Sequence, residues 1–240
     1  MLRCTIVLLA WLASSALAFG AEAEKPADFV SAMAPIMANL RTAASYARTG
    51  NVALAQIETD EAVARWKQLA PNAPGLLPAH PPADVSGFLD RGRDQLTTIA
   101  GALDRGDNAA AGRELLAIRQ AFHALRRQAG LYDLGDCIFE IAPAMETLRV
   151  AAIRYGDQPA SANAEGTVAA ASAFRDRLQR CSEWANGEIA AQGEFRRLID
   201  GAIASSGEIA HAAMAGDGPL VHRYLIELQS FAQLLDFRYG

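Results

Sequence analysis

A methionine and a histidine are the residues of this sequence whose types and positions suggest a cofactor site. Met33 lies near the start of the first segment rich in helix-forming residues, and His123 lies near the end of the fourth. When four helices run alternately up and down in a bundle, the start of the first and the end of the fourth share one end. A thioether and an imidazole that face each other there can be axial ligands of haem iron. The positions alone make Met33 and His123 candidate ligands, and Met37, one turn after Met33, is a rival sulfur ligand.

Residues on the same helical faces could complete such a site. Arg119 and Arg127 lie four residues on either side of His123, so they share its face and could pair with haem propionates. The apolar residues that could line the macrocycle are Ile36, Leu40, Phe88, Leu115 and Phe122. The simpler interpretation is structural, because a methionine at helical spacing is commonly a core residue and a lone histidine commonly has satisfied hydrogen bonds.

Four short stretches rich in glycine and polar residues separate long segments of helix formers. The segments between them repeat apolar residues at i, i+3, i+4 and i+7, and none alternates with the period of a β-strand. The sequence therefore predicts an all-α fold of four helical hairpins, with about eight helices. The separating stretches are residues 49–51, 105–107, 156–159 and 215–218. The expected helices are 27–48, 52–69, 85–104, 108–128, 135–154, 164–185, 188–214 and 219–237.

The predicted helices divide into two halves, and part of the first half recurs in the second. Met33 recurs as Met145, an offset of 112 positions, and Phe88 recurs as Phe195, an offset of 107. This period is too long for a solenoid, so we expect tandem up-down-up-down four-helix bundles. The expected domains are residues 19–129 and residues 130–240.

The first 18 residues have the features of an export signal. Arg3 precedes an apolar run, and Ala16-Leu17-Ala18 has the small residues that signal peptidase accepts. We expect residues 1–18 to be cleaved and the mature protein to be periplasmic. No later stretch reaches the ~18 uninterrupted apolar residues of a membrane span.

Two cysteines remain after that cleavage, in a compartment that favours disulfides. Residues equidistant from the turn of a helical hairpin lie at the same height on its two helices. The midpoint of Cys137 and Cys181 is 159, within the turn at residues 156–159. The sequence therefore predicts a disulfide that closes a loop of 44 residue steps, which in the chain-entropy model stabilises by about 4 kcal/mol.

Charge and motifs argue against several classes of function. The 22 Lys and Arg residues against 27 Asp and Glu residues give a net charge of −5, which does not favour nucleic acid as a partner. The chain has neither a Gly-x-Ser-x-Gly motif nor a glycine-rich phosphate loop, so hydrolase and nucleotide-dependent enzyme functions have no support in the sequence. His211 and His222, with Glu208 nearby, could bind Zn²⁺ or Cu²⁺ across the last hairpin, although exposed polar residues are the simpler interpretation. His80 lies in a loop and is expected to face solvent.

Three segments of the first half resemble the soluble periplasmic cytochrome b562 family. Residues 88–103 and 118–127 are similar to the third and fourth helices of that family, and residues 32–40 are similar to its first helix. The resemblance covers about residues 27–127. The hairpin around Gly106 is shorter than in the family.

The resemblance implies a periplasmic electron carrier that holds a non-covalent b-type haem and reacts with an unidentified redox partner. Met33 would be the sixth ligand of the iron and His123 the fifth, which leaves no open iron position for catalysis. Covalent attachment is disfavoured because the chain has no Cys-x-x-Cys-His.

When the second half is aligned with the first, Met145 takes the position of Met33. The position of His123 is taken by Asp236, at an offset of 113. A carboxylate is a poor partner for methionine on a low-spin haem. We therefore expect one haem, in the first bundle, and a degenerate second bundle. The alternative is a haem-free helical bundle that binds a partner, a metal or another ligand.

Overall fold

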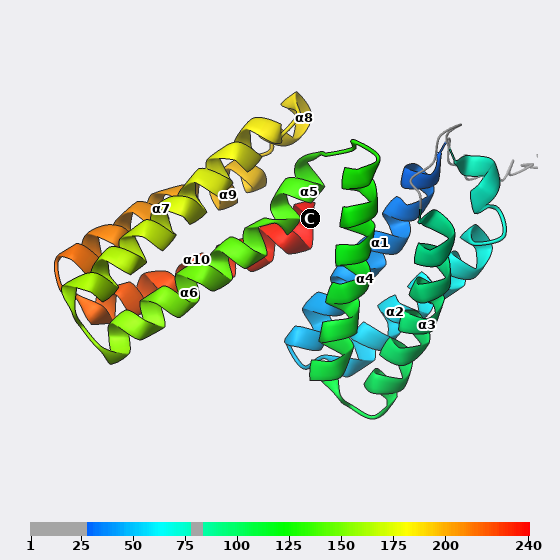
Figure 1. The fold of residues 1–240 in the computed structure, drawn as a ribbon, viewed down its shortest axis with the longest axis horizontal. Helices are drawn as coiled ribbons and strands as arrows, with labels where there is room; N and C mark the ends of the chain where they lie inside the picture. Colours follow the sequence, from blue (N-terminus) through cyan, green and yellow to red (C-terminus); the bar gives the residue numbers. More distant parts are fainter. Residues whose placement is uncertain (1–27, 78–83) are drawn as a thin grey trace, which may run out of the picture.

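The computed structural model describes residues 28–77 and 84–240, and within them the chain is all-α with no β-strand (Figure 1). The predicted fold class is confirmed. No helix in this part of the chain is long and apolar enough to cross a membrane. The predicted signal peptide and His80 lie outside the described residues.

The first half forms an antiparallel four-helix bundle. Its helices are α1 (Phe29–Arg48), α2 (Val52–Leu69), α3 (Val85–Asp104) and α4 (Asn108–Gln128), with a short 3-10 helix, η1 (Ala73–Leu76), after α2. Helix α1 packs against α2 and α4, and α3 packs against the same two helices, so the four helices close around one core. This arrangement brings the start of α1 and the end of α4 to the same end of the bundle (Figure 1).

The second half repeats the bundle and adds two short helices. Its helices are α5 (Leu134–Phe139), α6 (Ile141–Asp157), α7 (Ser161–Trp184), α8 (Gly187–Ala190), α9 (Gly193–Met214) and α10 (Gly218–Tyr239). The helix expected at 135–154 is divided at Glu140 into α5 and α6. Pro143 has no N–H to donate to the carbonyl of Phe139, which removes one hydrogen bond of a continuous helix at this point, whereas α1 continues through Pro35 without a break. The helix expected at 188–214 is likewise divided into α8 and α9.

Glycine and a capping side chain form three of the hairpin turns. Gly50, Gly106 and Gly216 have φ angles of 79°, 70° and 77°, a region that glycine enters without steric cost. The next residue then caps the following helix: Asp107 accepts a hydrogen bond from the amide of Ala110 at 2.9 Å, and Asp217 does the same in the last hairpin. These turns lie where the sequence predicts them.

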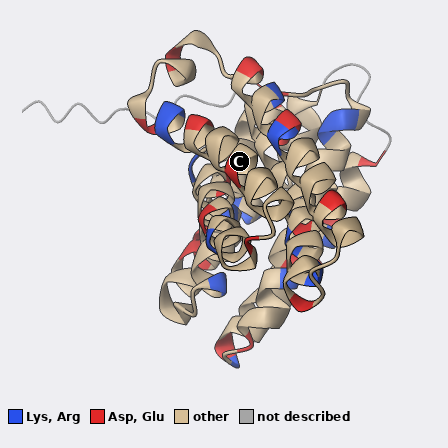
Figure 2. Cartoon of the chain, turned by 90° about the vertical axis from the view of Figure 1, so that its left-hand side faces the viewer, with Lys and Arg blue, Asp and Glu red and all other residues tan. Residues whose placement is uncertain are grey.

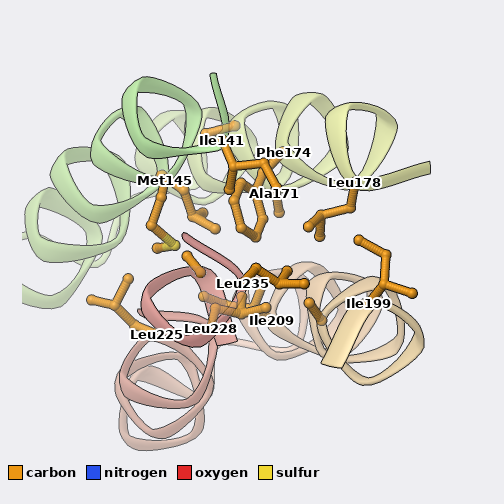
Figure 3. Packing of buried hydrophobic residues seen from close by; sticks show 14 of the residues in the cluster. Ile141, Met145, Ala171, Phe174, Leu178, Ile199, Ile209, Leu225, Leu228 and Leu235 are labelled. Carbon is orange, nitrogen blue, oxygen red and sulfur yellow. The ribbon is translucent and has the colours of Figure 1, made fainter. Parts of the chain in front are cut away.

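Each half has its own hydrophobic core. In the second half Met145, Phe174 and Leu228 point into the space between the helices (Figure 3). The buried positions of the two halves match with constant offsets. Those of α1 and α2 recur 112 residues later in α6 and α7, as Met33 and Met145 do. Those of α3 and α4 recur 110 residues later in α9 and α10.

These offsets correct two of the pairings expected from sequence. With an offset of 110, the counterpart of Phe88 is Leu198 rather than Phe195, and both Phe88 and Leu198 are buried. The counterpart of His123 is Gln233 rather than Asp236. The expected pairings used offsets of 107 and 113 for these helices. The chain between the second and third long helices is two residues shorter in the second half, so the offset falls from 112 to 110 for both.

The predicted disulfide joins Cys137 of α5 to Cys181 of α7, with their Cα atoms 5.4 Å apart. Both cysteines are buried in the second core. Helix α5 also packs against α6 and α10. The disulfide therefore fixes a helix of only six residues onto the second bundle.

Candidate functional site

Most of the predicted haem-site residues lie inside the first core. Met33, Ile36, Leu40, Phe88, Leu115 and Phe122 are all buried, and Met33 is 0% exposed. His123 lies elsewhere, because its side chain faces the second half of the chain. The structure therefore places the predicted ligands on different faces of the first bundle: Met33 in the core and His123 at the junction of the two bundles.

Helix α5 and the residue that follows it supply the hydrogen-bond partners of His123. Nδ1 of His123 lies 2.9 Å from Oδ1 of Asp136, and Nε2 lies 3.1 Å from Oε1 of Glu140. The imidazole also packs against the ring of Phe139, with 5.3 Å between centroids. Each ring nitrogen of His123 is thus engaged with a carboxylate oxygen. A ring nitrogen that binds iron would have to leave its carboxylate.

The carboxylate of Glu140 accepts three further hydrogen bonds. Arg127 donates to its Oε1 at 2.8 Å, and Arg177 and the hydroxyl of Tyr132 donate to its Oε2 at 2.6 and 2.9 Å. Burial, together with the hydrogen bond to Glu140, raises the pKa of Tyr132 to about 12. The predicted propionate partner Arg127 is thus engaged with a carboxylate of the second half.

Asp136 is the most buried carboxylate of the junction, with a side chain 4% exposed. It accepts hydrogen bonds from Nε and Nη2 of Arg126 at 3.0 and 2.9 Å, and Arg126 also binds Asp133. Burial pushes the pKa of Asp136 upward, but the hydrogen bonds from Arg126 and His123 outweigh burial and hold that pKa below its usual value. Asp136 and Asp133 also cap the start of α5 reciprocally.

Arg119, the other predicted propionate partner, makes a second link between the bundles. Its guanidinium donates two hydrogen bonds to Asp236 of α10, at 2.6 and 3.2 Å, and lies 5.0 Å from the ring centroid of Phe139. The side chain of Arg119 is only 9% exposed. Such a bidentate pair fixes the relative orientation of the guanidinium and the carboxylate as well as the distance between them.

The two halves have complementary charge. Residues 28–129 contain 11 Lys and Arg residues and 10 Asp and Glu residues. Residues 130–240 contain 9 Lys and Arg residues and 15 Asp and Glu residues. Charged residues are spread over the helices of both bundles (Figure 2). Each of the contacts described above between residues 28–129 and residues 130–240 joins an arginine or His123 of the first half to a carboxylate of the second. We call His123, Arg126, Asp136 and Glu140 the junction cluster.

The junction also contains a small cavity. Its volume is about 170 Å³, and its walls include Met37 and His123. Sites for drug-sized ligands occupy about 300–1,000 Å³, so a haem does not fit there in this arrangement of the helices. The cavity that His123 lines is thus smaller than a haem. A larger cavity, of about 800 Å³, lies at the same end of the bundle, but Met33, Met37 and His123 do not line it. Haem ligation by Met33 or Met37 with His123 stays a prediction.

Sequence reasoning missed the carboxylates that bind His123. Asp133, Asp136 and Glu140 lie at i, i+3 and i+7 just after the link between the halves, a spacing that places acidic groups on one helical face. Arg119, His123 and Arg126 have a matching spacing on α4. The acidic spacing after the link and the basic spacing on α4 together were the sequence signal that could have predicted this contact.

The remaining candidate residues stay apart from this site. His211 of α9 and His222 of α10 are both exposed. No group of three or more His, Cys, Asp or Glu residues within residues 28–77 and 84–240 is arranged to hold a metal ion.

No protein-family model, curated protein or solved structure matches this chain.

Acid is expected to weaken the junction through Asp136. An aspartate whose pKa is lowered on folding stabilises the folded state above its unfolded pKa of about 3.9, and that contribution is lost as the pH falls through the folded pKa. The difference in free energy of unfolding between the wild type and Asp136→Asn should therefore narrow below about pH 5. Urea unfolding between pH 7 and pH 3 measures it, with the exposed Asp157→Asn as the control. A difference that does not change with pH would contradict this assignment.

Proposed function

We propose that this protein is an exported, haem-free binding protein built from two four-helix bundles. Its role is to bind a ligand or a partner, and the contact between the bundles is the part of the molecule that serves this role. The compartment follows from the export signal expected in residues 1–18 and from the Cys137–Cys181 disulfide, which is compatible with an oxidising environment.

The contacts of His123 carry this proposal. Both ring nitrogens are within hydrogen-bond distance of a carboxylate, from Asp136 of α5 and from Glu140 directly after it. The side chains of Arg126, Arg127 and Arg177 hold those carboxylates in place. To ligate iron, His123 would have to leave Asp136 or Glu140, and a buried carboxylate would lose a partner. Such a loss is costly in a partly buried cluster of charges.

A haemin titration tests the proposal directly. Purified wild-type protein is expected to give no sharp low-spin bands after incubation with haemin and reduction, in a reduced-minus-oxidised absorption spectrum. His123→Ala should give the same spectrum as the wild type. Sharp bands that form in the wild type and vanish in His123→Ala would overturn the proposal, and circular dichroism on both proteins checks that they are folded.

One observation favours the sequence-derived haem protein as a second candidate. Met37 and His123 line the same cavity, so the alternative sulfur ligand and the imidazole do face a common space. This candidate needs Nε2 of His123 to be released from Glu140 and the cavity to widen. It predicts that Glu140→Gln increases haemin binding, whereas the haem-free proposal predicts no change.

A further inference from the structure

The larger cavity lies where α1 begins and α4 ends, and we call it the end cavity. Its volume is about 800 Å³, within the range of about 300–1,000 Å³ that sites for drug-sized ligands occupy. Its walls come from the start of α1, from η1 and Leu77 after it, from the end of α4, and from the link at residues 131–133. Segments that lie far apart in the sequence therefore surround a space large enough for an organic molecule.

Most of the wall of the end cavity is apolar. Phe29, Phe122 and Leu125 line it, and each is at most 8% exposed. The wall also contains aliphatic side chains that are half-buried or exposed, which are Val30, Leu76, Leu77 and Leu131. Removing apolar surface from water is favourable in proportion to the area removed. The end cavity therefore favours an apolar ligand.

The charged groups of the wall already have partners. Asp28 accepts a hydrogen bond from the amide of Ser31 at 2.7 Å. Nη2 of Arg126 donates to Asp133 at 2.6 Å and to Asp136 at 2.9 Å. A charged group of a ligand would lose water in the cavity without gaining an unpaired charge of the protein, and that loss is costly. The walls therefore favour a neutral ligand.

Aromatic rings make up part of the wall, from both ends of the sequence that forms it. Phe29 belongs to α1, Phe122 to α4, and Tyr132 to the link. Aromatic rings prefer offset-stacked or edge-to-face contacts with other rings. A flat aromatic molecule can make such contacts, whereas an aliphatic chain cannot.

The link that completes the end cavity is held by the second bundle. The hydroxyl of Tyr132 donates to Glu140 at 2.9 Å, and its ring packs against Trp184 of α7 with 5.0 Å between centroids. Arg126, which also lines the cavity, reaches Asp136 of α5. A ligand in the cavity therefore contacts side chains that join the two bundles. Because it binds the folded chain, it stabilises that contact.

We propose that the end cavity binds a small neutral aromatic molecule. This inference rests on the proposed function, which leaves the chemistry of the ligand open. The site is distinct from the haem site expected from sequence, because Met33, Met37 and His123 do not line it.

A fluorescence titration with N-phenyl-1-naphthylamine tests the inference on the full-length mature protein. This probe is neutral and aromatic, and its fluorescence rises in apolar surroundings. The wild type is expected to bind the probe, and neutral 1-naphthol is expected to displace it. 1-Naphthoate, which has the same rings with a negative charge, should displace it at least about tenfold more weakly than 1-naphthol.

A substitution in the wall locates the bound probe. Ala129 lines the end cavity and is exposed, so Ala129→Trp adds an indole to the cavity at little cost to the core. This variant should bind the probe about tenfold more weakly or worse, because the indole takes the space of the ligand. Ala169→Trp is the matched control, since Ala169 is exposed on α7 and does not line the cavity. It should bind the probe as the wild type does.

Circular dichroism checks that the variants are folded, and Ser31→Trp, at another exposed position of the wall, serves where Ala129→Trp does not fold. A wild type that does not bind the probe would mean that another part of the chain or a second copy closes the cavity, and it overturns the inference. Equal binding by the wall variant, or equal displacement by 1-naphthoate and 1-naphthol, also overturns it.

The haemin spectrum keeps failure of the inference apart from failure of the proposed function. Protein that binds neither the probe nor haemin overturns the inference and leaves the proposed function standing. Sharp haem bands that depend on His123 overturn the proposed function and, with it, the inference.

Discussion

Replacing Asp136 by alanine is expected to lower the free energy of unfolding by about 3–5 kcal/mol, the usual cost of removing one partner from a buried ion pair. The variant leaves Nδ1 of His123 and the guanidinium of Arg126 without their shared carboxylate, and both of those side chains are largely buried. It also removes half of the reciprocal cap at the start of α5. Urea unfolding followed by circular dichroism measures the loss.

Glu146→Ala is the matched control for this prediction. Glu146 also forms an ion pair, with Arg149, but its side chain is 57% exposed. Exposed pairs contribute only ~0.2–1 kcal/mol, so this variant should stay close to the wild type. If Asp136→Ala were as mild as Glu146→Ala, the junction cluster would not hold the two bundles together.

The helical hairpins could be predicted from the sequence because turn chemistry is local. Gly50, Gly106 and Gly216 each end a helix in a conformation that glycine favours, and the next residue is an asparagine or aspartate that caps the following helix. No knowledge of distant parts of the chain is needed for this. The disulfide could be predicted for a related reason, since Cys137 and Cys181 lie on either side of a single turn.

The division between α5 and α6 was harder to predict. The apolar pattern continues from Ile138 through Ile141 to Met145, so periodicity alone predicts one helix. Pro143 is the residue that interrupts its hydrogen bonds. The turn at Glu140 then directs the carboxylate of Glu140 and the ring of Phe139 toward α4.

The surroundings of His123 depend on how the two bundles meet, which hairpin geometry does not specify. From α4 alone, His123 can be placed on a face next to Arg119 and Arg127, but not on the face that contacts Met33. The carboxylates that bind it come from a helix of the other bundle. A resemblance confined to the first half contains no information on that contact, so it predicts the helices better than the site.

Helix α5 links the disulfide to the junction. Cys137 follows Asp136 directly, and Cys181 lies one turn beyond Arg177, which donates to Glu140. The covalent bond therefore holds α5 in the position from which its carboxylates reach His123. Six residues are too few for a helix to be stable by its own hydrogen bonds, so α5 depends on the bond and on its packing.

The double variant Cys137→Ser, Cys181→Ser is expected to lose about 4 kcal/mol of stability, from the chain entropy of a closed loop of 44 residues. Its effect should not add to that of Asp136→Ala, because release of α5 already weakens the contacts of Asp136. Residues that share one network show interaction energies of about 0.5–3 kcal/mol in a double-mutant cycle. Urea unfolding of the wild type, the two variants and their combination gives that energy.

Ser182→Ala provides the comparison for this cycle, since Ser182 lies next to Cys181 on α7 but bonds only Arg196 among the described residues. Its effect should add to that of Asp136→Ala within about 0.5 kcal/mol. Additive losses for the cysteine variant as well would mean that the disulfide stabilises the second bundle alone. A non-additive loss would mean that the bond acts across the junction, through the position of α5, on a histidine of the first bundle.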